Sequence, residues 1–241
     1  MAMPLIRRSL AEFIGTAFLL VAIVGSGIAA QRLSPGQPGL ELLEDAAATG
    51  TALVAIILMV GPVSGGHLNP LVSVVDAAFG GLPVVELPCY IAAQVLGAVT
   101  GVVVANVMFS LSAISISTHR RFGGGPWLGE AVATLGLLLV IFGVARSKQV
   151  AAVPFAVGAY IMGAYFFTSS MSFANPAVTI AREFSNSFAG ISPGSVGPFI
   201  GAELVGAAVG WLAIRTLFPS AREVAEVVVL PHGDAGREAN A

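Results

Sequence analysis

Two short stretches contain the residues best placed for chemistry, and both follow one pattern. They are residues 65–73, Gly-Gly-His-Leu-Asn-Pro-Leu-Val-Ser, and residues 172–179, Ser-Phe-Ala-Asn-Pro-Ala-Val-Thr. Asn before Pro predicts a helix start, because the Asn side chain caps the first turn and Pro lacks an N–H that would be unpaired there. A bilayer takes about 20 apolar residues, yet Asp76 interrupts the first run and Arg182 the second. The sequence therefore predicts two half-helices inside a membrane protein.

Such half-helices indicate a water-filled cavity, because irregular backbone at membrane depth must be buried in protein or line water. We predict that carbonyl groups before each Asn form ladders of acceptors along this cavity. These ladders would comprise Gly65, Gly66 and His67 in the first stretch and Met171, Ser172 and Phe173 in the second. Asn69 and Asn175 would each use the side-chain oxygen as a cap and direct the amide NH2 at a passing oxygen. This arrangement suits hydroxyl-bearing solutes, and the positive ends of the two helix dipoles disfavour cations and protons.

The composition indicates a membrane protein that crosses the bilayer several times. Of the 241 residues, 56% are hydrophobic and 10% are charged, and the mean hydropathy is +0.90. A net charge of −2 without a basic cluster argues against nucleic acid as a partner. The single cysteine, Cys89, excludes an intrachain disulfide and a thiolate metal cluster. We expect no metal and no cofactor.

The long uncharged runs predict an all-α membrane protein with six transmembrane helices and two re-entrant half-helices. The spans lie at about residues 10–30, 46–63, 87–111, 128–145, 150–170 and 196–217. We expect one channel domain over residues 1–218, with repeats at about 5–111 and 126–218, and a cytoplasmic C-terminal tail over residues 219–241.

Three features recur in the same order in the two halves of the chain. The matched pairs are Glu12 with Glu130, Asn69 with Asn175, and Gln94 with Glu203, at offsets of 118, 106 and 109 residues. Because each half holds an odd number of spans, the second half must enter the membrane inverted relative to the first. We expect the plasma (inner) membrane, with cytoplasmic N- and C-termini. This orientation puts seven Lys and Arg residues on the cytoplasmic side and four outside, and cytoplasmic segments usually carry the excess.

Through these motifs, the sequence resembles the aquaporin and aquaglyceroporin (major intrinsic protein) family over residues 5–218. The resemblance rests on the paired Asn-Pro motifs and on residues 11–16 (AEFIGT), 64–70 (SGGHLNP) and 90–97 (YIAAQVLG). It implies six tilted helices with two half-helices, in a homotetramer with one pore per subunit. It also implies that Glu12 and Glu130 accept backbone N–H groups of the re-entrant loops, whereas the role of Glu203 stays open.

The departures from the family pattern concern the width of the pore. Val178 stands where the second motif usually has an Arg, and family spacing assigns Thr49, Gly163 and Ser172 to the other selectivity positions. All four are small and uncharged, as in a wide-filter bacterial subgroup that resembles aquaglyceroporins associated with arsenic resistance. The centre is expected to include Pro70, Leu71, Pro176 and Ala177, and Leu71, in place of the usual Ala, would narrow it.

The sequence thus predicts a passive channel for glycerol, arsenous acid or other metalloid hydroxides, and water, lying in membrane lipid. The alternative is a proton-coupled secondary transporter that uses intramembrane carboxylates. An enzyme is not expected, because no nucleophile and base stand at usable spacing. Two residues keep two interpretations each. His67 is either a pore-lining spacer or a metal ligand or pH sensor, and Arg182 either reaches the mouth or points away from it.

Overall fold

The computed structural model describes residues 3–146 and 149–218, and the predicted tail over residues 219–241 lies outside this range. The described residues contain helices and loops and no strand. The helices are α1 (Leu5–Leu33), α2 (Pro38–Ser64), α3 (Pro70–Phe79), η1 (Val84–Glu86), α4 (Leu87–Met108), α5 (Gly124–Arg146), η2 (Val150–Ala152), α6 (Val153–Phe167), α7 (Pro176–Ala181), η3 (Arg182–Phe184) and α8 (Pro193–Leu217). The all-α prediction is confirmed.

Six of these helices are long and apolar enough to cross a membrane, and the short helices α3 and α7 are the two half-helices. The ends differ from those predicted. Helix α2 begins at Pro38, eight residues earlier than the uncharged run suggested, and so includes Glu41 and Asp45. Hydropathy misses this start because the first turn of α2 is polar. The turn is still helical, since Pro38 fits the first helical position and Glu41 stabilises the helix N-terminus. Helix α6 ends at Phe167, and the chain then runs as an irregular segment to Asn175.

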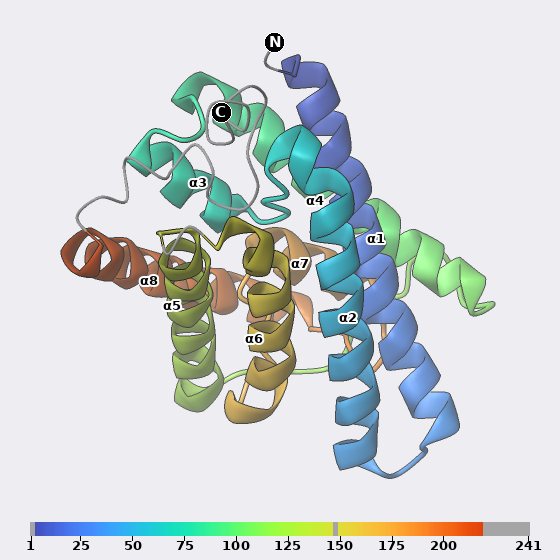
Figure 1. Ribbon diagram of the computed structural model, residues 1–241. Helices are drawn as coiled ribbons and strands as arrows, with labels where there is room; N and C mark the ends of the chain where they lie inside the picture. Colours follow the sequence, from blue (N-terminus) through green and yellow to red (C-terminus); the bar gives the residue numbers. More distant parts are fainter. Residues whose placement is uncertain (1–2, 147–148, 219–241) are drawn as a thin grey trace.

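The contacts between helices repeat from one half of the chain to the other (Figure 1). Helix α1 packs against α2 and α4, and α5 packs against α6 and α8 in the same way. The half-helices follow this rule, since α3 contacts α4 and α7 contacts α8. Helices α3 and α7 also contact one another, which brings the two motifs together near the middle of the protein.

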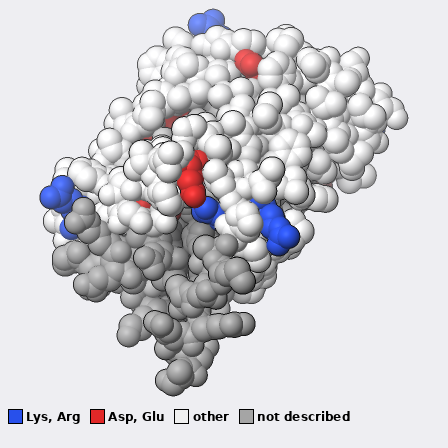
Figure 2. Space-filling model, turned by 90° about the horizontal axis from the view of Figure 1, so that it is seen from above, with Lys and Arg blue, Asp and Glu red and all other residues white. Residues whose placement is uncertain are grey.

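Glycines set the close approach of the paired helices. A Cβ atom on Gly97 of α4 would meet the Phe13 carbonyl group of α1, and one on Gly206 of α8 would meet the Ala131 carbonyl group of α5. Small residues at such crossings let helix backbones approach closely, which is how helices associate in lipid. The surface around the bundle is apolar, and Figure 2 shows few charged side chains on the described part of one end.

We expect Gly97→Ala to destabilise the fold by about 1–3 kcal/mol, because the added methyl group forces α1 and α4 apart. Gly201→Ala is the matched control, since a Cβ atom at this glycine of α8 would meet nothing within 4 Å. The measurement is the thermal unfolding midpoint of both variants in mild detergent. Equal midpoints for the two variants would show that the α1–α4 crossing tolerates a methyl group.

Candidate functional site

Each half-helix is capped by the Asn of its motif. Asn69 has an extended backbone (φ −154°, ψ 122°), and its Oδ1 accepts the N–H of Leu71 at 2.9 Å. Asn175 has nearly the same conformation (φ −159°, ψ 111°), and its Oδ1 accepts the N–H groups of Ala177 at 3.0 Å and Val178 at 3.4 Å. The Asn oxygens therefore satisfy N–H groups that the first helical turn leaves without partners.

The same two Asn side chains join the halves of the protein. Asn69 Nδ2 donates to the Ala174 carbonyl oxygen at 2.7 Å, and Asn175 Nδ2 donates to the Leu68 carbonyl oxygen at 2.8 Å. Each amide NH2 has two donors, so one hydrogen on each Asn is left for another acceptor. The N-termini of α3 and α7 are thus fixed next to one another by reciprocal bonds.

The loops before the motifs share an uncommon backbone conformation. Positive φ angles occur at Gly65, Gly66 and Leu68 in the first half, and at Met171, Ser172 and Ala174 in the second. These positions match at the same offset of 106 residues as the two Asn residues. A residue with a side chain is strained in this region, at a cost of order 1–3 kcal/mol. The same uncommon conformation therefore recurs at equivalent positions of the two loops.

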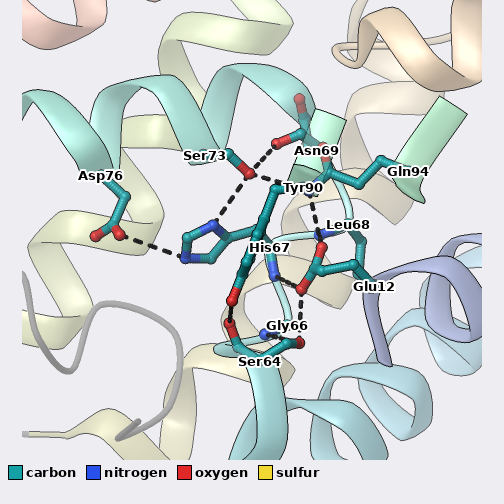
Figure 3. Close-up of polar contacts among 10 residues, drawn as sticks. All are labelled: Glu12, Ser64, Gly66, His67, Leu68, Asn69, Ser73, Asp76, Tyr90 and Gln94. Atoms are coloured by element: carbon teal, nitrogen blue, oxygen red, sulfur yellow. Dashed lines mark hydrogen bonds and ion pairs between the residues drawn. The ribbon is translucent and has the colours of Figure 1, made fainter. Parts of the chain in front are cut away.

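Glu12 supports the first loop from inside the helix bundle (Figure 3). Its carboxylate accepts the N–H groups of His67 at 3.0 Å and Leu68 at 2.7 Å, and the hydroxyl of Ser64 at 2.6 Å. Gln94 Nε2 donates to the same carboxylate at 2.8 Å and to Ser73 Oγ at 2.9 Å. Glu12 is fully buried, and its oxygens are occupied by these donors.

Two carboxylates, Glu130 and Glu203, support the loop and the motif of the second half. Glu130 accepts the N–H groups of Phe173 at 2.9 Å and Ala174 at 2.7 Å. Glu203 accepts the N–H of Asn175 at 3.3 Å and the hydroxyl of Thr179 at 2.5 Å. The hydrogen bonds expected of Glu12 and Glu130 are therefore present, and Glu203 joins them as a support for the motif.

A narrow cavity of about 60 Å³ runs between the halves and is lined by both motifs. One water needs about 10–15 Å³ of such space, so the cavity holds a short file of waters. The residues of the motifs that line it are Gly66, His67, Leu68, Asn69, Ser172, Phe173, Asn175 and Val178. The remaining wall is mostly apolar, with Leu19, Ile23, Leu53, Ile57, Leu137, Ile141, Val157 and Ile161. A wall that combines polar and apolar groups suits a small solute with hydroxyl groups.

Several residues of the predicted pore lie outside this lining. Gly65, Met171, Leu71 and Ala177 do not line the cavity, and Pro70 and Pro176 are buried at the starts of their helices. Leu71 packs in the apolar core instead of narrowing the centre. The reason is helical geometry, because the residue after the capping pair points away from the axis and Val72 faces it.

Three of the four predicted selectivity residues line the cavity. These are Thr49, Ser172 and Val178. The assignment of Gly163 is wrong, because this glycine is exposed and absent from the lining. Ile161 and Tyr165, four residues apart on one face of α6, line the cavity, and Gly163, midway between them, faces the opposite way. The structure therefore places an aromatic ring at the end of the cavity that Thr49 lines, with Tyr165 Oη 3.4 Å from Thr49 Oγ1.

A guanidinium group also lines this end of the cavity. Arg182, one turn beyond Val178, is fully buried and lines the cavity. Its Cζ lies 3.5 Å from the centroid of the Phe173 ring, and its Nε donates to the Ala189 carbonyl oxygen. Of the two interpretations of Arg182, the structure supports the one in which the side chain reaches the mouth.

His67 takes part in a buried contact that the sequence analysis did not anticipate. Its backbone lines the cavity, while its side chain is fully buried, with Nδ1 3.1 Å from Ser73 Oγ. Nε2 lies 3.5 Å from an oxygen of Asp76 on the same face of α3 (Figure 3). Across residues 3–146 and 149–218, no three His, Cys, Asp or Glu side chains are arranged to hold a metal ion. Ser73 and Asp76 lie three residues apart on α3, which Asn69 caps, so they share one face of the helix. This spacing was the signal in the sequence for the contact of His67 with Asp76.

Comparisons with known proteins agree with this geometry. A model of the major intrinsic protein family matches residues 1–172. The chain is 44% identical over 220 residues to the aquaglyceroporin AqpS of Rhizobium meliloti (strain 1021), across 91% of this chain and 94% of that protein. It is 31% identical to the lens fiber major intrinsic protein of Rattus norvegicus, across 97% of this chain and 90% of that one. The fold matches the X-ray structure of the aquaglyceroporin from Plasmodium falciparum with a TM-score of 0.70 at 22% identity, covering 90% of this chain and 99% of that one.

We expect Glu12→Leu to lower the yield of folded protein sharply, because it leaves the buried N–H groups of His67 and Leu68 without acceptors. Each such group costs about 1–3 kcal/mol. Glu44→Leu is the control, since Glu44 accepts a side-chain hydroxyl, from Ser34, and supports no loop N–H among the described bonds. Yield and unfolding midpoint are compared after the same purification. A Glu12→Leu protein as stable as the control would contradict the supporting role.

Proposed function

Since the chain belongs to the major intrinsic protein family, whose members are channels and not enzymes, we propose that it is a passive transmembrane channel for small neutral solutes. The solutes are glycerol, water, and arsenous acid or other metalloid hydroxides. The observation that carries this proposal is the cavity lined by both Asn69 and Asn175. Along it, loop carbonyl groups accept from a hydroxyl and the free Asn N–H groups donate to its oxygen. A neutral polyol meets partners at each step, whereas a cation meets the positive ends of two half-helices.

The outer filter consists of Thr49, Tyr165, Ser172, Val178 and Arg182. The guanidinium comes from one turn beyond the usual position and is held against Phe173. This leaves the short Val178 side chain at the place where an Arg would fill the lumen. We therefore propose a filter that is wide at Val178 and has a hydrogen-bond donor at its rim.

Metalloid hydroxides fit the same chemistry as glycerol. Arsenous acid is neutral and has three hydroxyl groups, so it can exchange its hydration for the carbonyl groups and Asn N–H groups of the cavity. The similarity to AqpS, which is named an aquaglyceroporin, supports polyol transport in this chain. Arsenous acid remains the special substrate that we propose.

The assembly and orientation complete the proposal. The excess of Lys and Arg residues supports cytoplasmic N- and C-termini in the plasma (inner) membrane of a bacterium. The large exposed apolar side chains of the single chain support burial in lipid and in a homotetramer with one pore per subunit. Native mass spectrometry measures the tetramer directly.

The rival function is a proton-coupled transporter, and the hydrogen bonds of the carboxylates argue against it. Glu12 and Glu130 are occupied by loop N–H groups and do not line the cavity. Proteoliposome swelling should therefore give glycerol and urea fluxes that rise linearly with the gradient and ignore a pH difference across the membrane. Saturating flux that follows the pH gradient would favour the transporter.

The filter proposal predicts that Val178→Arg lowers glycerol flux severalfold and water flux much less. The long side chain would occupy the widest part of the filter, and water needs only a single-file path. Gly163→His is the matched control, because this residue faces away from the cavity and its substitution should leave the ratio of the two fluxes unchanged. The measurement is paired swelling rates for water and glycerol, normalised to incorporated protein. A parallel decline of both rates in Val178→Arg would place the constriction elsewhere.

A further inference from the structure

A buried carboxylate at the outer end of the cavity has no part in the function proposed above. Asp45 lies on α2, one turn before the filter residue Thr49, and is 0% exposed. Its Oδ1 accepts the hydroxyl of Ser26 at 2.8 Å and that of Thr49 at 3.4 Å. Its Oδ2 is buried and accepts no hydrogen bond from the described residues. Unlike Glu12 and Glu130, it supports no loop N–H among the described bonds.

Two guanidinium groups lie at the same end of the protein. Arg182 lines the cavity, and its guanidinium interacts with the Tyr165 hydroxyl. Its Nη1 and Nη2 are buried and make no hydrogen bond of normal geometry with the described residues. Arg121, from the loop between α4 and α5, lies over the same Phe173 ring at 5.3 Å from its centroid. It donates to the carbonyl oxygens of Phe188 and Gly190 at 2.9 Å each, and it does not line the cavity. One arginine therefore lies buried in the cavity wall, and the other adds positive charge from behind it.

The charges at this end balance when the adjacent carboxylates of Glu130 and Glu203 are counted as one negative charge that shares a proton. The two arginines interact electrostatically with each other and with the carboxylates of Asp45 and Glu130. Glu130 is bound by the N–H groups of Phe173 and Ala174, so its place is fixed by the loop. Asp45 is the second negative charge. Without it, this end of the cavity would hold one net positive charge on a buried guanidinium.

Without the charge of Asp45, the guanidinium of Arg182 could bind a small carboxylate, because its paired N–H donors match the two carboxylate oxygens. An anion bound there would block the narrow cavity to neutral solutes. The low dielectric of a buried site would strengthen the attraction between anion and guanidinium, which acts against the cost of removing water from the anion.

We propose that Asp45 is a selectivity residue, whose charge offsets that of Arg182 and Arg121 and thereby keeps small anions from occupying the outer mouth. It acts through the two arginines and does not touch the solute. The inference rests on the proposed function, because it takes the cavity as the path of neutral solutes.

The test uses Asp45→Asn, which keeps the shape of the side chain and an acceptor for Ser26 but removes the charge. Proteoliposomes are equilibrated on both sides with formate, or with gluconate, which is too large for the cavity, at equal ionic strength and neutral pH. Glycerol and water swelling rates in formate are then divided by the rates of the same protein in gluconate. We expect a ratio near one for the wild type and a fall of at least about threefold for Asp45→Asn, since one uncompensated charge near the site strengthens anion binding.

Two further variants separate charge from structure. Ser26→Ala removes the shortest hydrogen bond to Asp45 without changing any charge, so it should be insensitive to formate. Asp45→Asn combined with Arg121→Gln restores the balance of charge without touching a cavity-lining residue, and it should lose the sensitivity. If that protein does not fold, Asp45→Asn with Arg182→Gln serves instead, because it removes the fork itself.

Three results would overturn the proposal: an insensitive Asp45→Asn, a wild type as sensitive as Asp45→Asn, or a sensitive Ser26→Ala. Failure of the proposed function has a different signature, which is the absence of glycerol flux through the wild type in gluconate. The water rates in formate would still decide the role of Asp45 in that case.

Discussion

The structure depends on one constraint, which is that backbone N–H groups inside a membrane must find acceptors where no lipid group can supply them. The irregular segments before α3 and α7 break this rule unless the bundle supplies acceptors. Glu12 and Glu130 do so from equivalent places on α1 and α5, and the Asn69 and Asn175 caps complete the pairing. These bonds satisfy the loop donors and hold the loops in place beside the cavity. Glu12 and Glu130 thus support the lining residues without lining the cavity themselves.

The two halves of the chain support their loops with different residues. They differ most at the end of the cavity that Arg182 lines. Gln94 bridges Glu12 and Ser73 in the first half, while Glu203 binds the motif and Thr179 directly in the second. Only the second half carries an arginine in the turn after its motif, and the structure sets Arg182 against Phe173 and near Asp45. In the function that we propose, the path of neutral solutes therefore passes a charged group, Arg182, whose charge Asp45 offsets.

Much of this architecture could be predicted from local sequence, and the errors have physical causes. Asn before Pro predicts a cap wherever it occurs, so the two half-helices and their meeting point followed from the motifs and from the inverted repeat. Gly163 was misassigned because counting back from Asn175 assumes a loop of fixed length, whereas the phase of α6 puts Ile161 and Tyr165 on the cavity side. The place of Arg182 depends on the fold of the neighbouring loop, which no local pattern encodes. The contact of His67 with Asp76 had only the spacing of Ser73 and Asp76 on α3 as a signal.

The central claim is that Asn69 and Asn175 cap their half-helices and bind across the repeat at the middle of one pore. A cryo-electron microscopy map of the protein in lipid nanodiscs with glycerol present tests it most directly. The account predicts that the two side chains lie together at mid-membrane, each donating to the loop carbonyl of the other half at the spacing of Ala174 and Leu68, with solute density between the motifs. Asn side chains at opposite surfaces, or solute density confined to a path that avoids both motifs, would contradict it.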